Sequence, residues 1–385
     1  MEHTKKALVI GMIDDHIDSL NQESSLNEAV QLLETFGATT EIVLTQHMRH
    51  RSGATFIGSG KVEEIRKLVD AQQIVIVVVN HHLKASQLFL LKNAIYADSP
   101  GDVWDRTQLI LHIFSKHAST AEAKLQIELA RLKSRGPELS GTGLGMSQQG
   151  GGIGTRGLGE TQSEMLRRHW RGEIKTIEAK LAKVNENRQR QMSQRKKLRL
   201  PTVSIIGYTN AGKTSLFNVL SKKEDKVQDA LFATLDSSVS SLFLPGLGKN
   251  VLISDTIGFI QDLPTTLIEA FQSTLLETVH ADLLLHVVDA TDPDMHLKIA
   301  TVQEILVDLN VSEIPQIVVF NKCDLLPKDA ESLLRVSYRD SKSLFTSAKE
   351  VLGIESLIQL IESELILLGV KKADYLTDLK KIESS

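Results

Sequence analysis

Four short polar peptides in the carboxyl-terminal half of the chain each follow an apolar, strand-like run. Polar peptides that follow parallel strands collect at the carboxyl edge of one sheet, which is where open α/β sheets bind their ligands. The pattern therefore predicts a mostly parallel α/β sheet with a binding site along that edge. The four peptides are Gly207-Tyr-Thr-Asn-Ala-Gly-Lys-Thr214, Asp255-Thr-Ile-Gly258, Asn321-Lys-Cys-Asp324 and Ser347-Ala-Lys349.

The first peptide has the spacing of a phosphate-binding loop. It follows the run 203–206 and leads into a helix-like stretch, so its amides and the helix start can face phosphates. In such loops the lysine, here Lys213, reaches the β and γ oxygens, and the hydroxyl of the next residue, Thr214, binds Mg²⁺. A glycine-rich turn without a ligand is the alternative, and the strand, loop and helix context disfavours it.

Asp255 closes the second apolar run. At that position its carboxylate can bind Mg²⁺ through water, and the amide of Gly258 can meet the γ-phosphate. Because hydrolysis removes that contact, residues 258–262 are expected to form a switch. A plain turn at a strand end is the alternative, but the distance in sequence from Lys213 suits the nucleotide interpretation.

The third and fourth peptides predict which base is bound. The carboxylate of Asp324 can accept hydrogen bonds from N1 and N2 of guanine, and adenine lacks both donors, so GTP should be preferred over ATP by roughly 10⁴ to 10⁵. Asn321 is expected to tie this loop to the phosphate loop, and the amide of Ala348 to meet guanine O6. Cys323 is the single cysteine. We interpret it as incidental, with a redox role as the alternative.

Composition is typical of a soluble intracellular protein. The 385 residues are 42% hydrophobic with a formal charge of −4, and no apolar run is long enough to span a bilayer. The start lacks a signal-peptide core. We therefore expect a cytoplasmic monomer of two or three domains, and peripheral attachment to a membrane stays open.

Upstream of residue 200, short apolar runs alternate with helix-like stretches, which predicts a small α/β domain over residues 1–110. The runs lie at 7–10, 41–44 and 74–79, and the helical stretches at 26–36, 62–70 and 85–95. Gly58-Ser-Gly-Lys61 resembles a second phosphate loop, but Val62 stands where Ser or Thr is needed. We interpret this peptide as a helix-start turn, with a second nucleotide site as the alternative.

Residues 111–199 are expected to form an antiparallel helical coil. Apolar residues on one face of residues 118–132 can pack against a heptad stripe that starts at Trp170. The first stripe is Ala121, Leu125, Leu129 and Leu132, and the second continues through Ile174, Ile177, Leu181 and Val184. Between them, residues 136–159 hold ten of the 24 glycines and are expected to form a mobile tip loop that binds a partner, or else a plain linker.

Positive charge is concentrated in the second helix of this coil. Residues 160–200 carry twelve Lys and Arg against five Glu, although the chain as a whole is acidic. The six cations that crowd the helix end are Arg188, Arg190, Arg195, Lys196, Lys197 and Arg199. This segregation favours phosphate contacts with RNA. A solvated helix whose cations complement the helix dipole is the alternative.

Several of these peptides together resemble the HflX family of ribosome-associated GTPases, from near residue 8 to about residue 368. The peptides that carry the resemblance are Asp105-Arg-Thr-Gln108, Gly151-Gly-Ile-Gly-Thr-Arg156, Gly159-Glu-Thr-Gln162, Phe232-Ala-Thr-Leu-Asp236 and Asp255-Thr-Ile-Gly-Phe259, with the phosphate loop. The resemblance implies a Ras-like GTPase domain after an α/β domain and a coil. It also implies binding to the large ribosomal subunit and its RNA, in splitting or rescue of ribosomes under stress. The family's switch threonine maps onto Thr234, which would contact Mg²⁺ and the γ-phosphate.

Phe259 stands where Ras-like enzymes have a glutamine that orients the attacking water. A phenyl ring cannot make that contact, so intrinsic hydrolysis should be slow and depend on a group from elsewhere, such as the ribosome. Related GTPases with a hydrophobic residue here bind K⁺ through an asparagine that corresponds to Asn210. K⁺ is therefore expected to raise the rate over Na⁺.

Two other classes of protein share part of this pattern. A P-loop metabolite kinase would use Lys213 and Asp255 but would not need Asn321 or Asp324. A structural RNA-binding coiled coil with a vestigial nucleotide site would show no nucleotide preference. Selective GTP binding, without transfer of phosphate to a metabolite, separates both classes from a GTPase.

The expected organisation is an amino-terminal α/β domain (1–110), the helical coil (111–199), a P-loop, Ras-like GTPase domain with a mostly parallel sheet (200–368) and a short polar tail (369–385). Lys213, Thr234 and Gly258 are expected to be catalytic, and Thr214, Thr234 and Asp255 to hold Mg²⁺. The residues expected to bind GTP or GDP are Gly207, Tyr208, Thr209, Asn210, Ala211, Gly212, Lys213, Thr214, Ser215, Phe232, Ala233, Thr234, Asp255, Thr256, Ile257, Gly258, Asn321, Lys322, Asp324, Ser347, Ala348 and Lys349.

Overall fold

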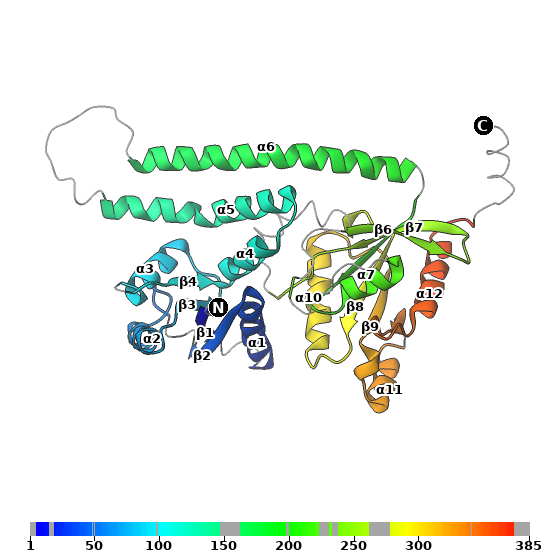
Figure 1. Ribbon diagram of the computed structural model, residues 1–385, viewed down its shortest axis with the longest axis horizontal. Helices are drawn as coiled ribbons and strands as arrows, with labels where there is room; N and C mark the ends of the chain where they lie inside the picture. The colour runs from blue at the N-terminus through cyan, green and yellow to red at the C-terminus, as the bar shows by residue number, and fades with distance from the viewer. Residues whose placement is uncertain are drawn as a thin grey trace. The chain divides into compact units, whose positions relative to one another are not determined.

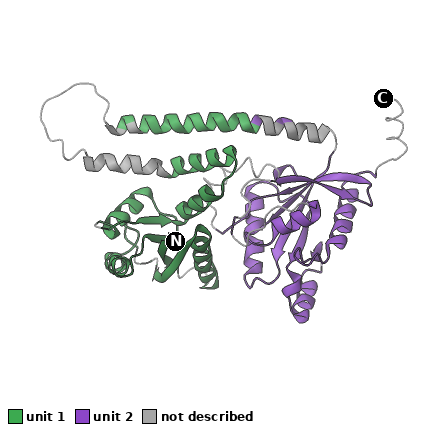
Figure 2. Ribbon diagram, viewed as in Figure 1, with its two compact units in different colours: residues 1–185, 263–271 green, residues 186–262, 272–385 purple. Residues whose placement is uncertain are grey.

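The structure is a computed structural model of the chain and forms two compact units, which we describe separately (Figures 1 and 2). The first unit contains the described residues up to Asn185, and the second contains the described residues from Glu186 onward. The structure describes residues 5–14, 19–47, 49, 51–97, 99–146, 162–197, 200–222, 231–232, 238–261, 278–339 and 341–372. Side chains are not described at residues 135–146, 162–163, 166, 187–189 and 191–197.

The first unit contains a four-stranded parallel sheet with the strand order β2-β1-β3-β4. Its strands are β1 (Lys5–Ile13), β2 (Ala38–His47), β3 (Ile76–Asn80) and β4 (Asp102–Asp105), and its helices are α1 (Ser19–Phe36), α2 (Ser59–Gln72), α3 (Ala85–Ile95) and α4 (Arg106–His117). Residues 7–10 of β1 and 76–79 of β3 are buried throughout, because helices cover both faces of the central strands. The small α/β domain is confirmed, and β4 is a strand that the apolar runs did not reveal.

The peptide that ends β4 holds this sheet to its helices. Asp105 caps α4 by accepting the amide of Gln108 (2.7 Å), and it also accepts the amide of Leu83 (3.2 Å). Arg106 forms a buried ion pair with Glu28 of α1 and donates to Asn80 Oδ1 (2.7 Å). Asp105 and Arg106 therefore stabilise the packing of helices on the sheet of the first unit.

Gly58 is the N-cap of α2 and has an extended backbone (φ −63°, ψ 146°). Lys61 pairs with Glu64 on the same helix at 2.9 Å. The hydroxyl of Thr55 donates to the carbonyl of Ile57 at 2.6 Å. These contacts confirm that Gly58-Ser-Gly-Lys61 starts a helix.

Helices α5 (Ala121–Met146) and α6 (Gln162–Lys197) lie side by side as an antiparallel pair (Figure 1). Leu129, Ile177 and Leu181 form the buried centre of their contact. At one side the indole of Trp170 donates to the carbonyl of Leu132 (2.8 Å). The predicted coil is confirmed in its packing.

Helix α5 differs from the prediction in two ways. It has a second buried face, formed by Ala123, Ile127 and Ala130, and it packs on α3 and α4. It also continues to Met146, so residues 136–146, predicted as part of the tip loop, are helical. Local propensity predicts an end here, because glycine costs about 1 kcal/mol and a proline such as Pro137 about 3 kcal/mol within a helix. The helix is already nucleated over the preceding residues, and each further residue adds a backbone hydrogen bond. The rest of the predicted tip, from residue 147 on, lies outside the described residues.

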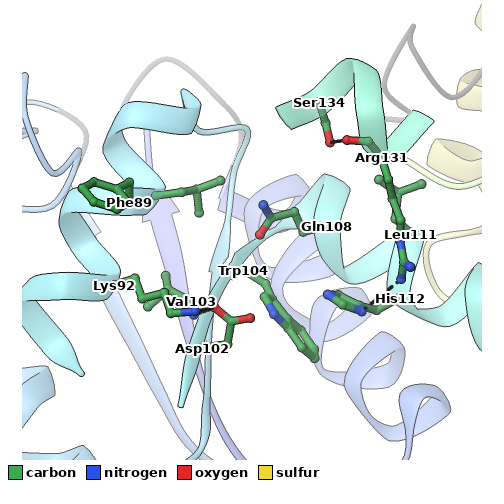
Figure 3. A pocket seen from close by; sticks show the side chains of 11 residues that line it. Phe89, Lys92, Asp102, Val103, Trp104, Gln108, Leu111, His112, Arg131 and Ser134 are labelled. Carbon is green, nitrogen blue, oxygen red and sulfur yellow. Dashed lines mark hydrogen bonds and ion pairs between the residues drawn. The ribbon is translucent and has the colours of Figure 1, made fainter. Parts of the chain in front are cut away.

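A pocket of about 280 Å³ lies where α5 meets β4 and α4 (Figure 3). On its wall the indole of Trp104 stacks on the imidazole of His112, with ring centroids 4.1 Å apart. Arg131 of α5 approaches His112 Nδ1 at 3.4 Å. These contacts join the coil to the sheet of the first unit.

The second unit contains a six-stranded sheet with the strand order β10-β9-β8-β5-β7-β6, parallel except where β6 runs antiparallel to β7. Its strands are β5 (Thr202–Gly207), β6 (Ser238–Leu244), β7 (Lys249–Asp255), β8 (Leu283–Asp289), β9 (Gln316–Asn321) and β10 (Ser343–Phe345). Its helical elements are α7 (Lys213–Ser221), α10 (Met295–Asp308), the 3₁₀ turn η2 (Cys323–Leu325), α11 (Lys328–Ser337) and α12 (Ile354–Leu367).

The core of this unit positions the carboxyl ends of its strands. Alternate residues of β5, β7 and β8 pack on one face of the sheet against α7 and α12. Leu216 of α7 and Leu357 of α12 are fully buried in this contact. Gly207 ends β5, Asp255 ends the adjacent β7, and Asn321 ends β9, which β8 separates from β5. Because these strands are parallel, all three residues lie at a single edge of the sheet. The predicted fold class is confirmed. Among the described helices, none has both the length and the apolar character needed to cross a bilayer.

Candidate functional site

Residues 207–214 form a tight loop between β5 and α7 that depends on two glycines. Gly207 has φ +145°, and a Cβ there would lie 2.2 Å from the carbonyl oxygen of Val287. Gly212 has φ +89°, and its Cβ would lie 2.2 Å from Asn321 Nδ2. Only glycine suits both positions, and the helix begins directly afterwards at Lys213.

Lys213 is buried within this loop, and its ammonium group donates to the carbonyl of Tyr208 at 2.7 Å. Burial lowers the pKa of Lys213 to about 8, and the negative charge of Asp255 opposes the shift. A buried cation at a helix start is suited to polyanionic phosphates.

Thr214 and Asp255 meet beside Lys213. The hydroxyl of Thr214 donates to Asp255 Oδ2 at 2.8 Å, and Asp255 is buried at the end of β7. A hydroxyl and a carboxylate on adjacent elements are hard oxygen donors of the kind that Mg²⁺ accepts together with waters and phosphates. The residues therefore fit the predicted magnesium site.

Gly258 and Phe259 lie against the phosphate loop. The amide of Phe259 donates to the carbonyl of Gly207 (3.1 Å), and the amide of Thr209 donates to the carbonyl of Phe259 (2.8 Å). A Cβ on Gly258 would lie 2.9 Å from Lys213 Nζ. The Phe259 side chain is buried, so at this position the backbone, not the side chain, is available to the site.

Asn321 connects the third and fourth peptides to the first. Its Nδ2 donates to the carbonyl of Ala211 (3.0 Å), and its Oδ1 accepts the amide of Ala348 (3.0 Å). The predicted tie to the phosphate loop is confirmed. Asp324 lies exposed on η2, and Lys322 pairs with Asp289 at 2.6 Å. The carboxylate of Asp324 is thus accessible to a base.

Cys323 is a half-buried free thiol in the same turn. Burial first, and then the negative charges of Glu331 and Asp324, raise the pKa of the Cys323 thiol. Because the thiolate is the reactive form, this environment favours the interpretation of Cys323 as incidental.

The structure brings together most of the residues that the sequence assigns to the site. Thr256 anchors β7 to β5 through a bond from its hydroxyl to the carbonyl of Ile205 (2.7 Å). Phe232 is buried with φ +59°. Ala233, Thr234 and Asp262 lie outside the described residues, as do Gly151 to Arg156. The described residues of the site are contributed by β5, α7, β7, β9, η2 and the loops that follow β5, β7 and β10.

Two residues of this region have surroundings that the sequence did not predict. His286 of β8 is buried, and burial first, then the charge of Lys213, lowers its pKa to about 4. An apolar strand that contains one histidine gives no signal for such a position. Tyr208 was assigned only as part of the loop, although an aromatic residue between two small ones was an available signal.

Comparison with known proteins decides the family. A "GTPase HflX" of Caldanaerobacter subterraneus is 46% identical over 349 residues, which cover 91% of this chain and 79% of that protein. The Escherichia coli "GTPase HflX" is 37% identical and covers 88% of this chain and 79% of that protein. The chain belongs to the GTPase HflX family. It is a GTP-hydrolysing enzyme that binds GTP and GDP.

Family descriptions match successive parts of this HflX chain. "GTP-binding GTPase N-terminal" matches residues 23–115, "GTP-binding GTPase Middle Region" matches 117–195, and "50S ribosome-binding GTPase" matches 202–322. A crystal structure of SsGBP in complex with GDP has the same fold, with a TM-score of 0.53 and 24% identity, and covers 95% of this chain and 99% of that one. Membership of this family excludes the two alternative classes, a P-loop metabolite kinase and a coiled coil with a vestigial nucleotide site.

Proposed function

We propose that this GTPase binds the large ribosomal subunit when loaded with GTP, acts in splitting or rescue of ribosomes under stress, and is stimulated by the ribosome. The proposal is supported by the match of residues 202–322 to a family described as ribosome-binding. It is also supported by the buried side chain of Phe259. That side chain cannot orient water, so a group from a partner is needed for fast hydrolysis.

The observation that carries RNA binding is a basic hollow on α6. Gly172, Thr176 and Ala179 lie on one side of the helix, and Lys175, Lys180 and Lys183 surround them in a shallow hollow. Small residues let a phosphate backbone approach the helix, while the three lysines supply the charge. This surface is the proposed contact with ribosomal RNA, together with the amino-terminal domain.

The same proposal assigns roles within the nucleotide site. Lys213 and the amide of Gly258 hold the γ-phosphate, and the switch threonine Thr234 joins them. Thr214, Asp255 and Thr234 hold Mg²⁺, which neutralises phosphate charge. Asn321, Lys322, Asp324, Ser347, Ala348 and Lys349 hold the base, and the remaining residues of 207–215, 232–234 and 255–258 surround the phosphates.

Asn210 is the proposed ligand of K⁺. It lies exposed in the phosphate loop with φ +61°, so its side chain is accessible beside the phosphates. Replacing K⁺ by Na⁺ should lower the hydrolysis rate in the wild type and have no effect in Asn210→Ala. Equal wild-type rates in the two salts would exclude K⁺.

The proposed organisation keeps the division into residues 1–110, 111–199, 200–368 and 369–385. We also propose that the protein is a cytoplasmic monomer, with peripheral membrane attachment as an open variant. Sedimentation of the purified chain at several concentrations tests the monomer.

The decisive experiment measures GTP hydrolysis and co-sedimentation with each purified ribosomal subunit. GTP-analogue-loaded protein should pellet with large subunits more strongly than GDP-loaded protein, and large subunits should raise the rate. A triple variant, Lys175→Glu, Lys180→Glu and Lys183→Glu, should lose pelleting and its salt dependence but keep intrinsic hydrolysis. The matched control is Lys371→Glu with Lys372→Glu, two exposed lysines outside the proposed RNA contact, which should pellet normally. Equal pelleting of the two nucleotide states refutes the proposal.

A further inference from the structure

Tyr208, the second residue of the phosphate loop, is buried and makes its side-chain contacts with the segment after β7 and with α10. Its hydroxyl accepts the backbone N–H of Gln261 at 2.7 Å. Lys298 of α10 lies over the ring, 5.1 Å from its centroid, and is itself paired with Asp292. The ring is thus fixed by a cation–π contact while its hydroxyl ties down residue 261.

The backbone around Tyr208 forms a short ladder with the same segment. Phe259 exchanges bonds with Gly207 and Thr209, on either side of Tyr208. The carbonyl of Tyr208 accepts from Lys213. The hydroxyl of Tyr208 adds one more rung, two residues beyond Phe259.

This ladder determines where Gly258 lies. A Cβ on Gly258 would be 2.8 Å from Thr209 Cγ2 and 2.9 Å from Lys213 Nζ, so its backbone is held directly beside the lysine. Phosphoryl transfer depends on positioning, and the Phe259 side chain cannot supply it. Positioning at this place in the site therefore depends on the backbone of the segment.

We propose that Tyr208 is a positioning residue for GTP hydrolysis: its hydroxyl holds Gln261 and so keeps the Gly258 amide aligned with Lys213. The inference rests on the GTPase activity of the family and is independent of ribosome binding. Because the tie is one hydrogen bond at a site already closed by the ladder, its loss costs rate more than binding.

The test is Tyr208→Phe in the full-length protein, which removes only the hydroxyl. The intrinsic kcat should fall about fivefold, the effect of one net hydrogen bond. KM for GTP and Kd for GDP should stay within about twofold, as expected when an interaction matters in the transition state. Gln261→Pro removes the donor of the same bond and should reproduce the fall. The double variant should be no slower than either single one, since both remove one bond.

Tyr338→Phe is the matched control. The Tyr338 hydroxyl bonds His296 Nδ1 at 3.0 Å on the surface of the same unit, so its loss should leave kcat unchanged. The proposal is overturned if Tyr208→Phe leaves kcat unchanged, or if the effects of Tyr208→Phe and Gln261→Pro on kcat are additive in the double variant. It is also overturned if GDP affinity falls as much as kcat. The last outcome would mean a purely structural role. If Tyr208→Phe does not fold, an unchanged kcat in Gln261→Pro overturns the proposal alone.

Discussion

Each unit of the molecule has a glycine and lysine peptide at the start of a helix, but only one of the two forms a cradle for phosphates. In the second unit Gly212 has a positive φ and Lys213 is buried against the loop. In the first unit Gly58 is extended and Lys61 pairs with Glu64 on the surface of α2. A glycine and a lysine at the start of a helix are therefore not enough to form a phosphate site. The glycines must also have a positive φ and lie in a short loop between a strand and a helix.

The lysines give the largest expected contrast. Lys213→Ala removes the buried cation that contacts phosphate, so kcat/KM for GTP should fall at least about a hundredfold. Lys61→Ala removes a surface ion pair, and kcat/KM should be unchanged. Steady-state kinetics of both variants tests the contrast. If kcat/KM of Lys213→Ala falls by less than about tenfold, the loop does not act through this cation.

The glycines give the next contrast. Gly212→Ala forces a Cβ to within 2.2 Å of Asn321 Nδ2 at φ +89°, and it should weaken GDP binding at least about tenfold and cost ~2 kcal/mol of stability. A Cβ at Gly60 meets nothing within 4 Å, so Gly60→Ala in α2 should stabilise by about 0.5–1 kcal/mol. Calorimetric GDP titration and denaturant unfolding measure the two effects. The same sign of stability change in both variants would refute this account.

Two asparagines at strand ends sharpen the comparison further. Asn321→Ala removes the tie between the base loop and the phosphate loop and should weaken GTP and GDP binding about tenfold. Asn80→Ala leaves Arg106 without one acceptor, so it should lower the unfolding free energy by about 1–3 kcal/mol and leave nucleotide affinity unchanged. Nucleotide titration and denaturant unfolding of both variants decide. A loss of affinity in Asn80→Ala would show that the first unit influences the nucleotide site.

Much of this site follows from sequence because backbone geometry constrains the residues. Gly207, Gly212 and Asn321 serve positions that few other residues can fill, so their spacing predicts both the loop and the tie that the structure has. The alternating apolar runs likewise predict the sheets. The strand β4 is short, with only Val103 and Trp104 as apolar signals, which is why it was missed.

Other features depend on tertiary packing that periodicity does not encode. The second buried face of α5 exists because α3 and α4 lie beneath it, and a search for one heptad stripe cannot find two faces. The predicted tip is helical as far as Met146, and the glycines of residues 136–146 gave no sign of this continuation. The burial of His286 and the contacts of Tyr208 arise from neighbours more than 50 residues away in sequence or on other strands.

The last contrast between the two lysines concerns the pH dependence of stability. The pKa of Lys213 is lowered by burial from its usual 10.5 to about 8, so between these pH values the unfolded chain binds more protons than the folded one. The unfolding free energy of the nucleotide-free protein should therefore rise with pH in this window, by up to about 1.4 kcal/mol per pH unit from this group. Lys213→Met should lack this increment, so the unfolding free energy of the wild type minus that of the variant should increase from pH 8 to pH 10. Lys61→Met in the first unit should run parallel to the wild type. Parallel curves for Lys213→Met would mean that this lysine is not held in a desolvated environment, and the contrast between the two lysines would then rest on geometry alone.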